Sequence, residues 1–512
     1  MAKGIDLLAN SSERGSSSSR SGYNDLLLSQ GSTVVPSGEA ANTEDFSPTL
    51  LTADGGKTLV EESAPDGTSF SNGTQATAST SADSDLSAGP TLSQPDPVTG
   101  VPTLRLPPPT SQEASGLYLI GITDNLLETD GLPQARALQR LAELNIQPLN
   151  VYRHVGIAVA RLTPQQAQDL KANSGVSFVE ANQQVFLLDA RAGQAQPTAR
   201  PTKPGDGGST TSQVLDWGVK EVWNGNGLTN WDPAAAKAWV IDSGVSTNTK
   251  DLVIDSRSTG FYSSGSSGAS FQDADGHGTH VAGIIAAQNN TVGTVGVAAG
   301  AAVVALRVFF PGEATYDDRI IAAINYAVAN KNVNQTNVNQ TNVINMSLGR
   351  AGGLGTAYTN AISAAVSVGF QFAIAAGNED SDVDNYSPAS AGDLPGVFTV
   401  SAAGRYAPHP KRPGTYTATT DERYPLVMAH FSNYDNLGDP TDDVAYAAPG
   451  LLITSLGLNG ELVQMSGTSM ASPHMAGALL RGNYGTMPEE SIAPFFTSYN
   501  GDAAPDPLVN LI

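Results

Sequence analysis

Three residues far apart in the sequence have the types needed for nucleophilic hydrolysis. Asp242 ends an apolar stretch, His277 lies between two glycines, and Ser469 lies among small residues. A serine hydroxyl becomes a useful nucleophile when an imidazole accepts its proton and a carboxylate orients that imidazole. An aspartate at a strand end is also a common turn former, so Asp242 alone would predict little.

The stretch around Ser469 favours a reactive serine over an ordinary core helix. Gly467 precedes the serine, and small residues predominate in this stretch, so a substrate backbone could approach closely. Pro473 is tolerated in the first turn of a helix, where its missing N–H has no intrahelical partner. The α/β-hydrolase elbow does not fit, because it needs glycine at Ala471 and the order Ser, Asp, His.

Two of the six histidines in the chain lie close together, which raises the alternative of a metal site. His277 and His280 have a spacing of three residues, but no third His or Cys ligand stands near them. We therefore predict that His277 is a general base at a helix start. His280, one turn further, is predicted to pack or to orient its neighbours.

The composition changes along the chain and predicts four parts. Residues 1–115 are rich in Ser, Thr, Pro and Asp, as in a disordered tail. Residues 116–187 have the element order β-α-β-β-α-β of a small α+β, ferredoxin-like domain. Residues 188–213 resemble a flexible linker. In residues 214–512 apolar strands alternate with helices, which predicts an α/β fold with a parallel central sheet covered on both faces.

Within 116–187 the pattern predicts particular elements. Leucines at helical spacing predict a helix over 132–145. Thr163 and Pro164 have the types of a helix cap and a first helical residue. Residues 176–188 are predicted to form one final strand.

Charge and composition exclude several functions. The net charge of −23 argues against nucleic acid as a partner, because phosphate binding needs Lys and Arg. The chain has no cysteine, so it has no disulfide, thiolate metal site or cysteine nucleophile. No apolar run is long enough to span a bilayer, and the N-terminus lacks the apolar core of a signal peptide.

Five motifs in order resemble those of the subtilisin-like serine proteases, the peptidase S8 family. The motifs are WVIDSGV, DGHGTHVAG, NMSLG, AIAAGNED and SGTSMASPHMAG. They carry Asp, His and Ser in the subtilisin order. NYSPAS at 385–390 and HFSNYD at 430–435 are similar to the proteinase K-like branch. The resemblance covers the chain from Trp217 to its C-terminus and implies the three-layer subtilisin-like fold, while 116–187 resembles the propeptide inhibitor of such proteases.

The resemblance implies a role for each catalytic residue. Ser469 attacks the scissile carbonyl, His277 takes its proton, and Asp242 holds the imidazole. The resemblance also implies that the Asn378 side chain and the backbone N–H of Ser469 donate hydrogen bonds to the oxyanion.

It also implies a substrate-binding segment. Ser347, Leu348 and Gly349 would pair with the peptide as an added strand and wall the specificity pocket. Gly377 and Glu379 flank the oxyanion asparagine and are assigned to the same site.

Two residues near this segment leave questions open. Glu379 is either a rim residue that admits basic side chains or a solvated surface acid. Arg350 stands where the family has a small residue, so the outer subsites are not predicted.

No cofactor is required for the chemistry, whereas structural calcium is common in the family. The candidate oxygen ligands are Asp273, Asp275, Asp380, Asp382, Asp384, Asp442 and Asp443. Ala445 replaces a carboxylate expected five residues before Gly450, so a site with the carbonyls of Pro395 and Val397 is not assigned and the metal ligands stay unknown.

Three further features depart from the family pattern. Residues 406–430 form an insertion of unassigned role. The tandem NVNQT repeat at 332–341 is predicted to be an exposed loop, and the closing C-terminal helix is shorter than expected.

These observations predict a serine endopeptidase that is made as a self-processing zymogen. The 116–187 domain would assist folding and block the cleft until cleavage in the linker. The expected partners are protein or peptide substrates and this domain in cis. The protein is expected to be a monomer outside the cell or at its surface. The alternatives are a non-catalytic binding protein with the same fold, and a dedicated maturation protease or peptide macrocyclase.

Overall fold

The computed structural model describes most of the chain beyond residue 116. The described residues are 91–92, 104–105, 116–122, 139, 141–173, 175–188, 196–197, 213–225, 229–231, 235–262, 265–331, 341–412, 415–435, 443–491 and 507–511. Most of the predicted tail, helix 132–145 and linker, nearly all of the NVNQT repeat, and Asp442 lie outside them.

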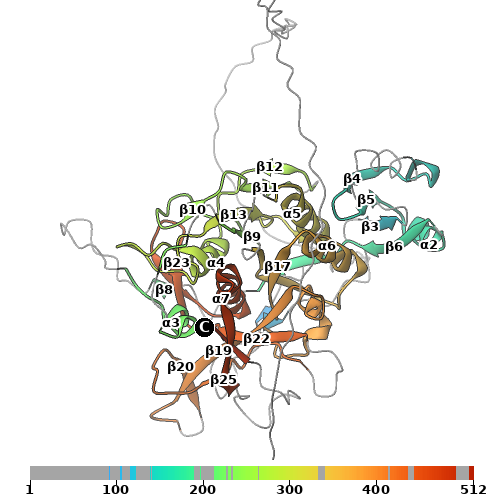
Figure 1. Cartoon of the computed structure of the whole chain (residues 1–512). Coiled ribbons are helices and arrows are strands. Elements are labelled where there is room, and N and C mark those ends of the chain that lie inside the picture. The colour runs from blue at the N-terminus through green and yellow to red at the C-terminus, as the bar shows by residue number, and fades with distance from the viewer. Residues whose placement is uncertain are drawn as a thin grey trace, which may run out of the picture. The chain divides into compact units, whose positions relative to one another are not determined.

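A large, mostly parallel sheet forms the centre of the described structure (Figure 1). Its order is β12-β11-β13-β9-β15-β17-β19-β22-β26-β25, and β10 pairs with β13. The bounds are β9 Ala238–Asp242, β10 Val253–Ile254, β11 Thr259–Phe261, β12 Ser267–Ala269, β13 Ala302–Arg307, β15 Asn342–Met346, β17 Phe370–Ala375, β19 Val397–Pro408, β22 Val444–Pro449, β25 Tyr484–Ser491 and β26 Pro507–Leu511. The strands from β13 to β22 in this order pair in parallel, as the alternating pattern predicts.

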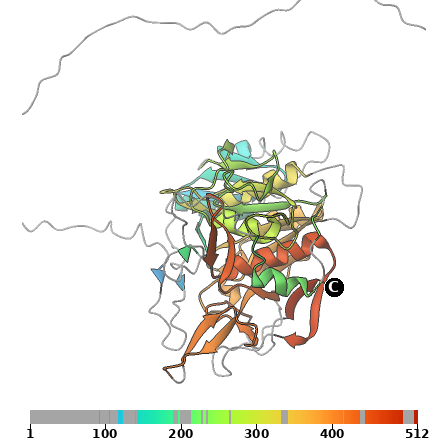
Figure 2. The same cartoon turned by 90° about the vertical axis from the view of Figure 1, so that its left-hand side faces the viewer.

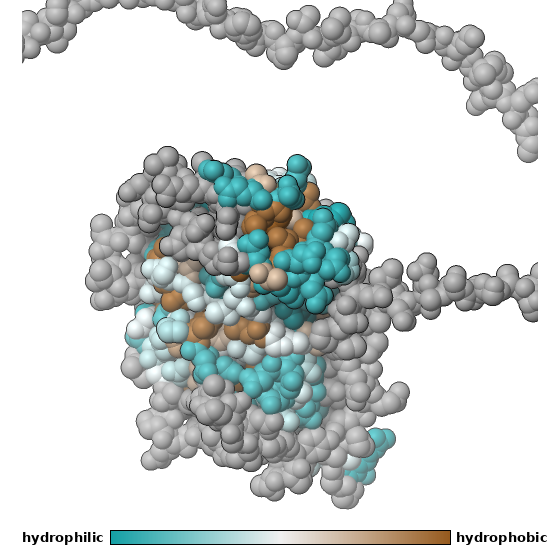
Figure 3. Space-filling view, turned by 90° about the vertical axis from the view of Figure 1, so that its right-hand side faces the viewer, coloured by the Kyte–Doolittle hydropathy of each residue, from teal (hydrophilic) through white to brown (hydrophobic). Residues whose placement is uncertain are grey.

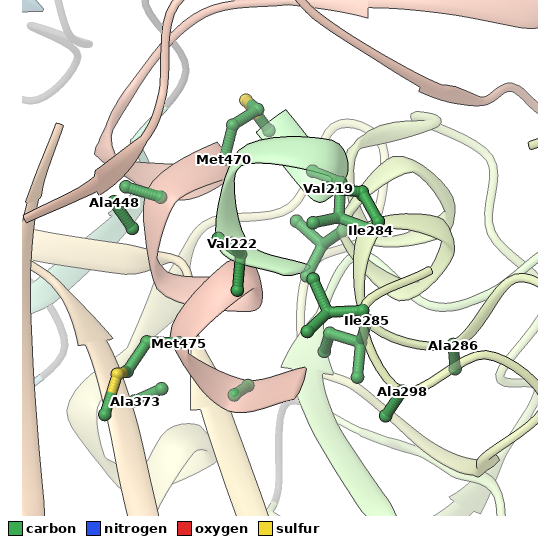
Figure 4. Close-up of a cluster of buried hydrophobic side chains, with 14 of the residues drawn as sticks. Val219, Val222, Ile284, Ile285, Ala286, Ala298, Ala373, Ala448, Met470 and Met475 are labelled. Carbon is green, nitrogen blue, oxygen red and sulfur yellow. The ribbon is translucent and has the colours of Figure 1, made fainter. Parts of the chain in front are cut away.

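Helices cover both faces of this sheet, which gives three layers. The helices are α3 Trp217–Trp223, α4 His277–Ala286, α5 Asp317–Ala329, α6 Thr356–Ser367 and α7 Thr468–Arg481. In β9, Ala238 and Val240 pack in the apolar cluster of α3, α4 and α7, whereas Trp239 and Ile241 pack in that of α5 and α6. Figure 4 shows the first cluster, with Val222 of α3, Ile285 of α4 and Met475 of α7. The predicted three-layer α/β fold is confirmed.

Glycines let α4 and α7 each pack closely against the chain segment beside them. A Cβ atom on Gly477 of α7 would lie only 2.5 Å from Cβ of Val297. A Cβ atom on Gly283 of α4 would lie 2.3 Å from Oγ of Ser455. These glycines are therefore needed for close approach.

A second, smaller sheet lies N-terminal to the large one. It is antiparallel, in the order β4-β5-β3-β6, with β3 Leu117–Ile122, β4 Pro148–Tyr152, β5 Ile157–Arg161 and β6 Val176–Ala181. Helix α2, Pro164–Lys171, packs against β6. Thr163 caps this helix, Gln166 completes a capping box, and Pro164 is in the first turn as predicted.

The prediction of one strand over 176–188 is wrong. The segment forms β6 and then β7, Gln184–Leu187, which belongs to a different sheet. β7 lies between β14, Thr315–Tyr316, and β16, Leu348–Ala351, and β16 also pairs with β18, Tyr386–Ser387. The break occurs because Asn182 and Gln183 bind the start of α5.

The 406–430 insertion forms strands that extend the large sheet. β20, Tyr416–Thr419, and β21, Leu426–Met428, pair with the end of β19, and the hairpin of β19 and β20 extends beyond the sheet (Figure 2). Arg405 at its base forms an ion pair of 2.8 Å with Glu221 of α3.

Shorter elements complete the described part. They are β1 Thr91–Leu92, β2 Leu104–Arg105, β8 Gln196–Pro197, β23 Ile453–Leu456, β24 Leu462–Met465, and the 3-10 helices η1 Val383–Asn385 and η2 Ala389–Ala391. β8, from the predicted linker, pairs with β24. No helix among the described residues is long and apolar enough to cross a membrane. On the face in Figure 3, hydrophobic residues form small areas within a mostly polar or neutral described surface.

We expect Gly477→Ala to lower the free energy of unfolding by about 1–3 kcal/mol, because the added methyl group forces α7 away from Val297. Denaturant unfolding of this variant, made in the Ser469→Ala protein to prevent self-digestion, measures the loss. Ala329→Ser, at an exposed position of α5, is the control and should change stability by less than about 0.5 kcal/mol. Equal stability of the two variants would contradict the packing argument.

Candidate active site

Asp242 and His277 meet at the carboxyl edge of the parallel sheet. Asp242 is the last residue of β9, and His277 is the first residue of α4. His277 Nδ1 lies 2.9 Å and 3.1 Å from the two carboxylate oxygens of Asp242, and both side chains are fully buried. Burial raises the pKa of Asp242, while the neighbouring imidazole and the Ser243 N–H oppose this rise. The carboxylate therefore favours the tautomer that places a proton on Nδ1.

Asp273 holds the start of α4 beside β9. Its carboxylate accepts hydrogen bonds from Ser243 Oγ at 3.0 Å and from the N–H groups of Gly276 and Thr279 at 3.0 Å each. The cap residue Gly276 has φ +103° and no side chain of its own to cap the helix. Asp273, considered above as a calcium ligand, is thus engaged in positioning His277, a role that its motif did not reveal.

His280 faces away from this pair. Its Nε2 lies 3.2 Å from the carbonyl of Ile453 and 3.0 Å from that of Val463. Burial lowers the pKa of His280 to about 3, so the imidazole is neutral. These contacts fit the predicted packing role rather than a metal pair.

Ser469 and Asn378 converge on one carbonyl oxygen, that of Leu188. Ser469 Oγ donates a hydrogen bond to it, and Asn378 Nδ2 donates another at 2.8 Å. Asn378 Oδ1 accepts from the N–H and the hydroxyl of Thr468, at 2.8 Å and 2.9 Å. Because a backbone N–H can only donate, these bonds fix which end of the amide points to Leu188. Thr468 was not among the predicted site residues.

The segment that ends at Leu188 lies in the cleft as an extended strand. Leu187 pairs with Leu348, and Phe186 pairs with Gly349. The Leu188 N–H donates to the carbonyl of Ser347 at 3.5 Å. The predicted segment 347–349 therefore contacts a bound strand, which here belongs to the same chain.

Two side chains of the bound strand are deeply buried. Leu188 is 2% exposed and packs against Ala375, and a Cβ atom on Gly349 would lie 3.1 Å from its Cδ1. Val185 is also 2% exposed and belongs to the apolar cluster of α5 and α6. The cleft thus has apolar space for the residue at the carbonyl and for the residue three positions before it.

Glu379 points its carboxyl group inward. Oε2 accepts from Asn433 Nδ2 at 2.7 Å and from the Asn378 N–H at 2.9 Å. These two hydrogen bonds argue against a solvated surface acid, and burial raises the pKa of Glu379 to about 8. Gly377, with φ +113°, leaves space for this arrangement, because a Cβ atom there would lie 2.2 Å from Asn433 Nδ2. The motif that contains Asn433 had only indicated a branch of the family.

Structural calcium at the candidate carboxylates stays a prediction. No group of three or more His, Asp or Glu side chains within the described ranges could hold a metal ion. Burial and a hydrogen bond with Asp384 raise the pKa of Asp443 to about 8, as expected for a carboxyl that keeps its proton.

Comparisons with known proteins agree with this fold. A model of the subtilase family matches residues 237–493. Alkaline serine exoprotease A of Vibrio alginolyticus is 31% identical over 67% of this chain and 54% of its own length. A subtilisin-like protease of Coccidioides posadasii is 32% identical over 62% of this chain and 67% of its own length. The chain thus spans about half of the first of these relatives.

A solved structure shows the same fold. The epidermin leader peptide processing serine protease of Staphylococcus aureus matches with a TM-score of 0.50 and 18% identity, over 75% of this chain and 95% of that protein. A parallel sheet that presents a buried Asp–His pair and a serine to an extended strand defines a class of serine hydrolases. The chain belongs to the subtilase family, whose members are subtilisin-like serine endopeptidases and need no cofactor for catalysis.

We expect Glu379→Gln to change how stability depends on pH. The pKa of Glu379 is raised from 4.5 to about 8 in the folded protein, so its contribution to stability is complete below about pH 4.5 and is lost as the pH rises through 8. Unfolding of the Ser469→Ala protein with and without Glu379→Gln measures this, and the glutamate form should lose stability relative to the glutamine form across that range. A difference that does not change with pH would contradict the buried, protonated carboxyl.

Proposed function

We propose that this chain is a serine endopeptidase that acts through Asp242, His277 and Ser469, with Asn378 as an oxyanion donor. The observation that carries the proposal is the Leu188 carbonyl, which accepts hydrogen bonds from both Ser469 Oγ and Asn378 Nδ2. Acyl transfer requires a nucleophile beside the carbonyl carbon and a donor at its oxygen, and this pair of contacts brings both groups to one carbonyl.

The proposed reaction has two stages. Ser469 Oγ attacks the carbonyl carbon while His277 accepts its proton, and Asp242 stabilises the imidazolium that forms. Asn378 and the Ser469 N–H stabilise the oxyanion. His277 then protonates the leaving amine, and water releases the acyl group by the same steps in reverse.

The bond after Leu188 is the self-processing site in this proposal. The linker 187–213 was predicted to contain the cleavage point. In this proposal the cleaved bond is the one between Leu188 and Asp189, at the end of the bound strand. Residues 116–187 would then act as an inhibitor that is held in the cleft by its own C-terminal strand.

Contacts of this domain with the large sheet's helices support a folding role. The Glu180 carboxylate accepts from the N–H groups of Thr356 and Ala357, at 2.7 Å and 3.2 Å. It caps the start of α6, whose own N-cap residue, Gly355, has no side chain. The domain thereby satisfies donors that the catalytic part leaves open.

The bound strand also indicates the substrates. Leu188 and Val185 fill apolar space, so we propose protein or peptide substrates with apolar residues at these two positions. Near neutral pH a protonated Glu379 would not attract a basic side chain. The proteinase K-like branch, the monomeric state and a location outside the cell stay predictions.

The experiment that tests the proposal compares purified wild type with Ser469→Ala by intact mass spectrometry. We expect the wild type to yield a fragment that begins at Asp189, and the variant to stay whole. A wild type that remains whole would contradict self-processing, and a variant that is cut at the same bond would contradict the role of Ser469.

We expect Asn378→Ala to lower kcat by about 100- to 1,000-fold with a small change in KM, because the donor acts mainly on the transition state. This magnitude comes from the corresponding donor of subtilisin, a member of the same family. Hydrolysis of a peptide with Leu before the cleaved bond measures both constants. Asn385→Ala, at an exposed asparagine of η1, is the matched control and should leave kcat unchanged.

A further inference from the structure

Arg350, which stands where a small residue was expected, forms a buried ion pair with Asp317. Its Nε lies 3.0 Å and 3.1 Å from the two carboxylate oxygens of Asp317. Arg350 is 9% exposed and Asp317 is 2% exposed. The guanidinium also donates to the carbonyls of Ala351 and Gly352, at 3.2 Å and 3.3 Å. These contacts fix the Asp317 carboxylate at the end of the substrate-binding strand β16.

The same aspartate holds the backbone of Gln183 at two points. The Asp317 N–H donates to the Gln183 carbonyl at 2.9 Å, and the Gln183 N–H donates to Asp317 Oδ2 at 3.3 Å. Gln183 is the sixth residue before the proposed cleavage point, counting Leu188 as the first. The contact therefore lies beyond the strand pairing of β7, which begins at Gln184.

A substrate backbone would satisfy groups that the enzyme leaves open at this position. The N–H groups in the first turn of a helix have no intrahelical acceptor, and α5 has no side-chain cap at Tyr316. A carboxylate oriented by an arginine is also a strong acceptor for a peptide N–H. Neither contact depends on the side chain of the sixth residue.

We propose that Asp317, held in place by Arg350, binds the backbone of the sixth residue before the scissile bond, so that the enzyme favours peptides with at least six residues on that side. Asp317 is a substrate-binding residue in this scheme, and Arg350 is a positioning residue. The inference rests on the proposed peptidase function and adds a preference for peptide length to it.

The test uses the wild-type enzyme after self-processing and three synthetic peptides. The first is acetylated and carries the sequence of residues 183–191. The second is acetylated and begins one residue later, so its acetyl group keeps a carbonyl at the sixth position but lacks the N–H. The third equals the first with an N-methyl group on the nitrogen of its first residue, which replaces the hydrogen of that N–H with a methyl group.

We expect kcat/KM to be about five- to tenfold higher for the first peptide than for the other two, as for the net contribution of a typical hydrogen bond. The enzyme stays unchanged across these assays, so folding cannot confound the comparison. Equal kcat/KM for all three would overturn the proposed contact of Asp317 with the sixth residue while leaving the peptidase function intact. Absence of hydrolysis of every peptide would overturn both.

A variant pair then assigns the acceptor. In Asp317→Ala the first and the third peptide should have about equal kcat/KM, so the N-methyl penalty is lost, because the oxygen that accepts the hydrogen bond from the N–H is gone. Asp318→Ala is the matched control on the same turn of α5. It should keep the full penalty, since Asp318 contacts Asn182, which these peptides lack. A penalty that survives in Asp317→Ala would contradict the assignment.

Discussion

The arrangement of the site depends on one amide group, that of Asn378, being held in a single orientation. Thr468 supplies the N–H and the hydroxyl that bind its oxygen, and this leaves Nδ2 pointing at the Leu188 carbonyl. Thr468 is the first residue of α7, so its N–H has no acceptor within the helix. A donor fixed before the reaction requires no reorganisation when negative charge develops on the carbonyl oxygen.

The parallel sheet and its small residues place the other groups around this point. β9, β15 and β17 are parallel, so they end at the same edge of the sheet. Asp242, Ser347 and Asn378 lie at the ends of these strands or just after them. α4 and α7 contact each other, and glycines let each helix also lie close to a further segment, Gly283 beside Ser455 and Gly477 beside Val297. Asp273 then joins the start of α4 to the loop after β9.

Motif order and residue chemistry predicted the three layers, the Asp242–His277 contact and the strand contact of 347–349. The layers follow local rules, because strand ends and helix starts are visible in the sequence, whereas the two contacts were implied by the resemblance to subtilisin-like proteases. Other features depend on partners that are distant in the chain. The inward turn of Glu379 needs Asn433, and the ion pair of Arg350 needs Asp317. Sequence periodicity carries no signal for either contact.

The split of 176–188 into two strands has the same origin. Its alternation is typical of one strand, and only the contacts of Asn182 and Gln183 with α5 show why the segment leaves its own sheet. The segment thereby reaches the cleft and presents Leu188 to Ser469.

The central claim is that Ser469 is reactive because His277 accepts its proton. Labelling of the processed protein with a fluorophosphonate probe, followed by mass spectrometry of its peptides, tests this most directly. The account predicts a modified Ser469 in the wild type and loss of that label in a folded His277→Ala variant from which residues 1–188 have been removed, because this variant would not process itself. Labelling of Ser469 at the same rate in both proteins would contradict it.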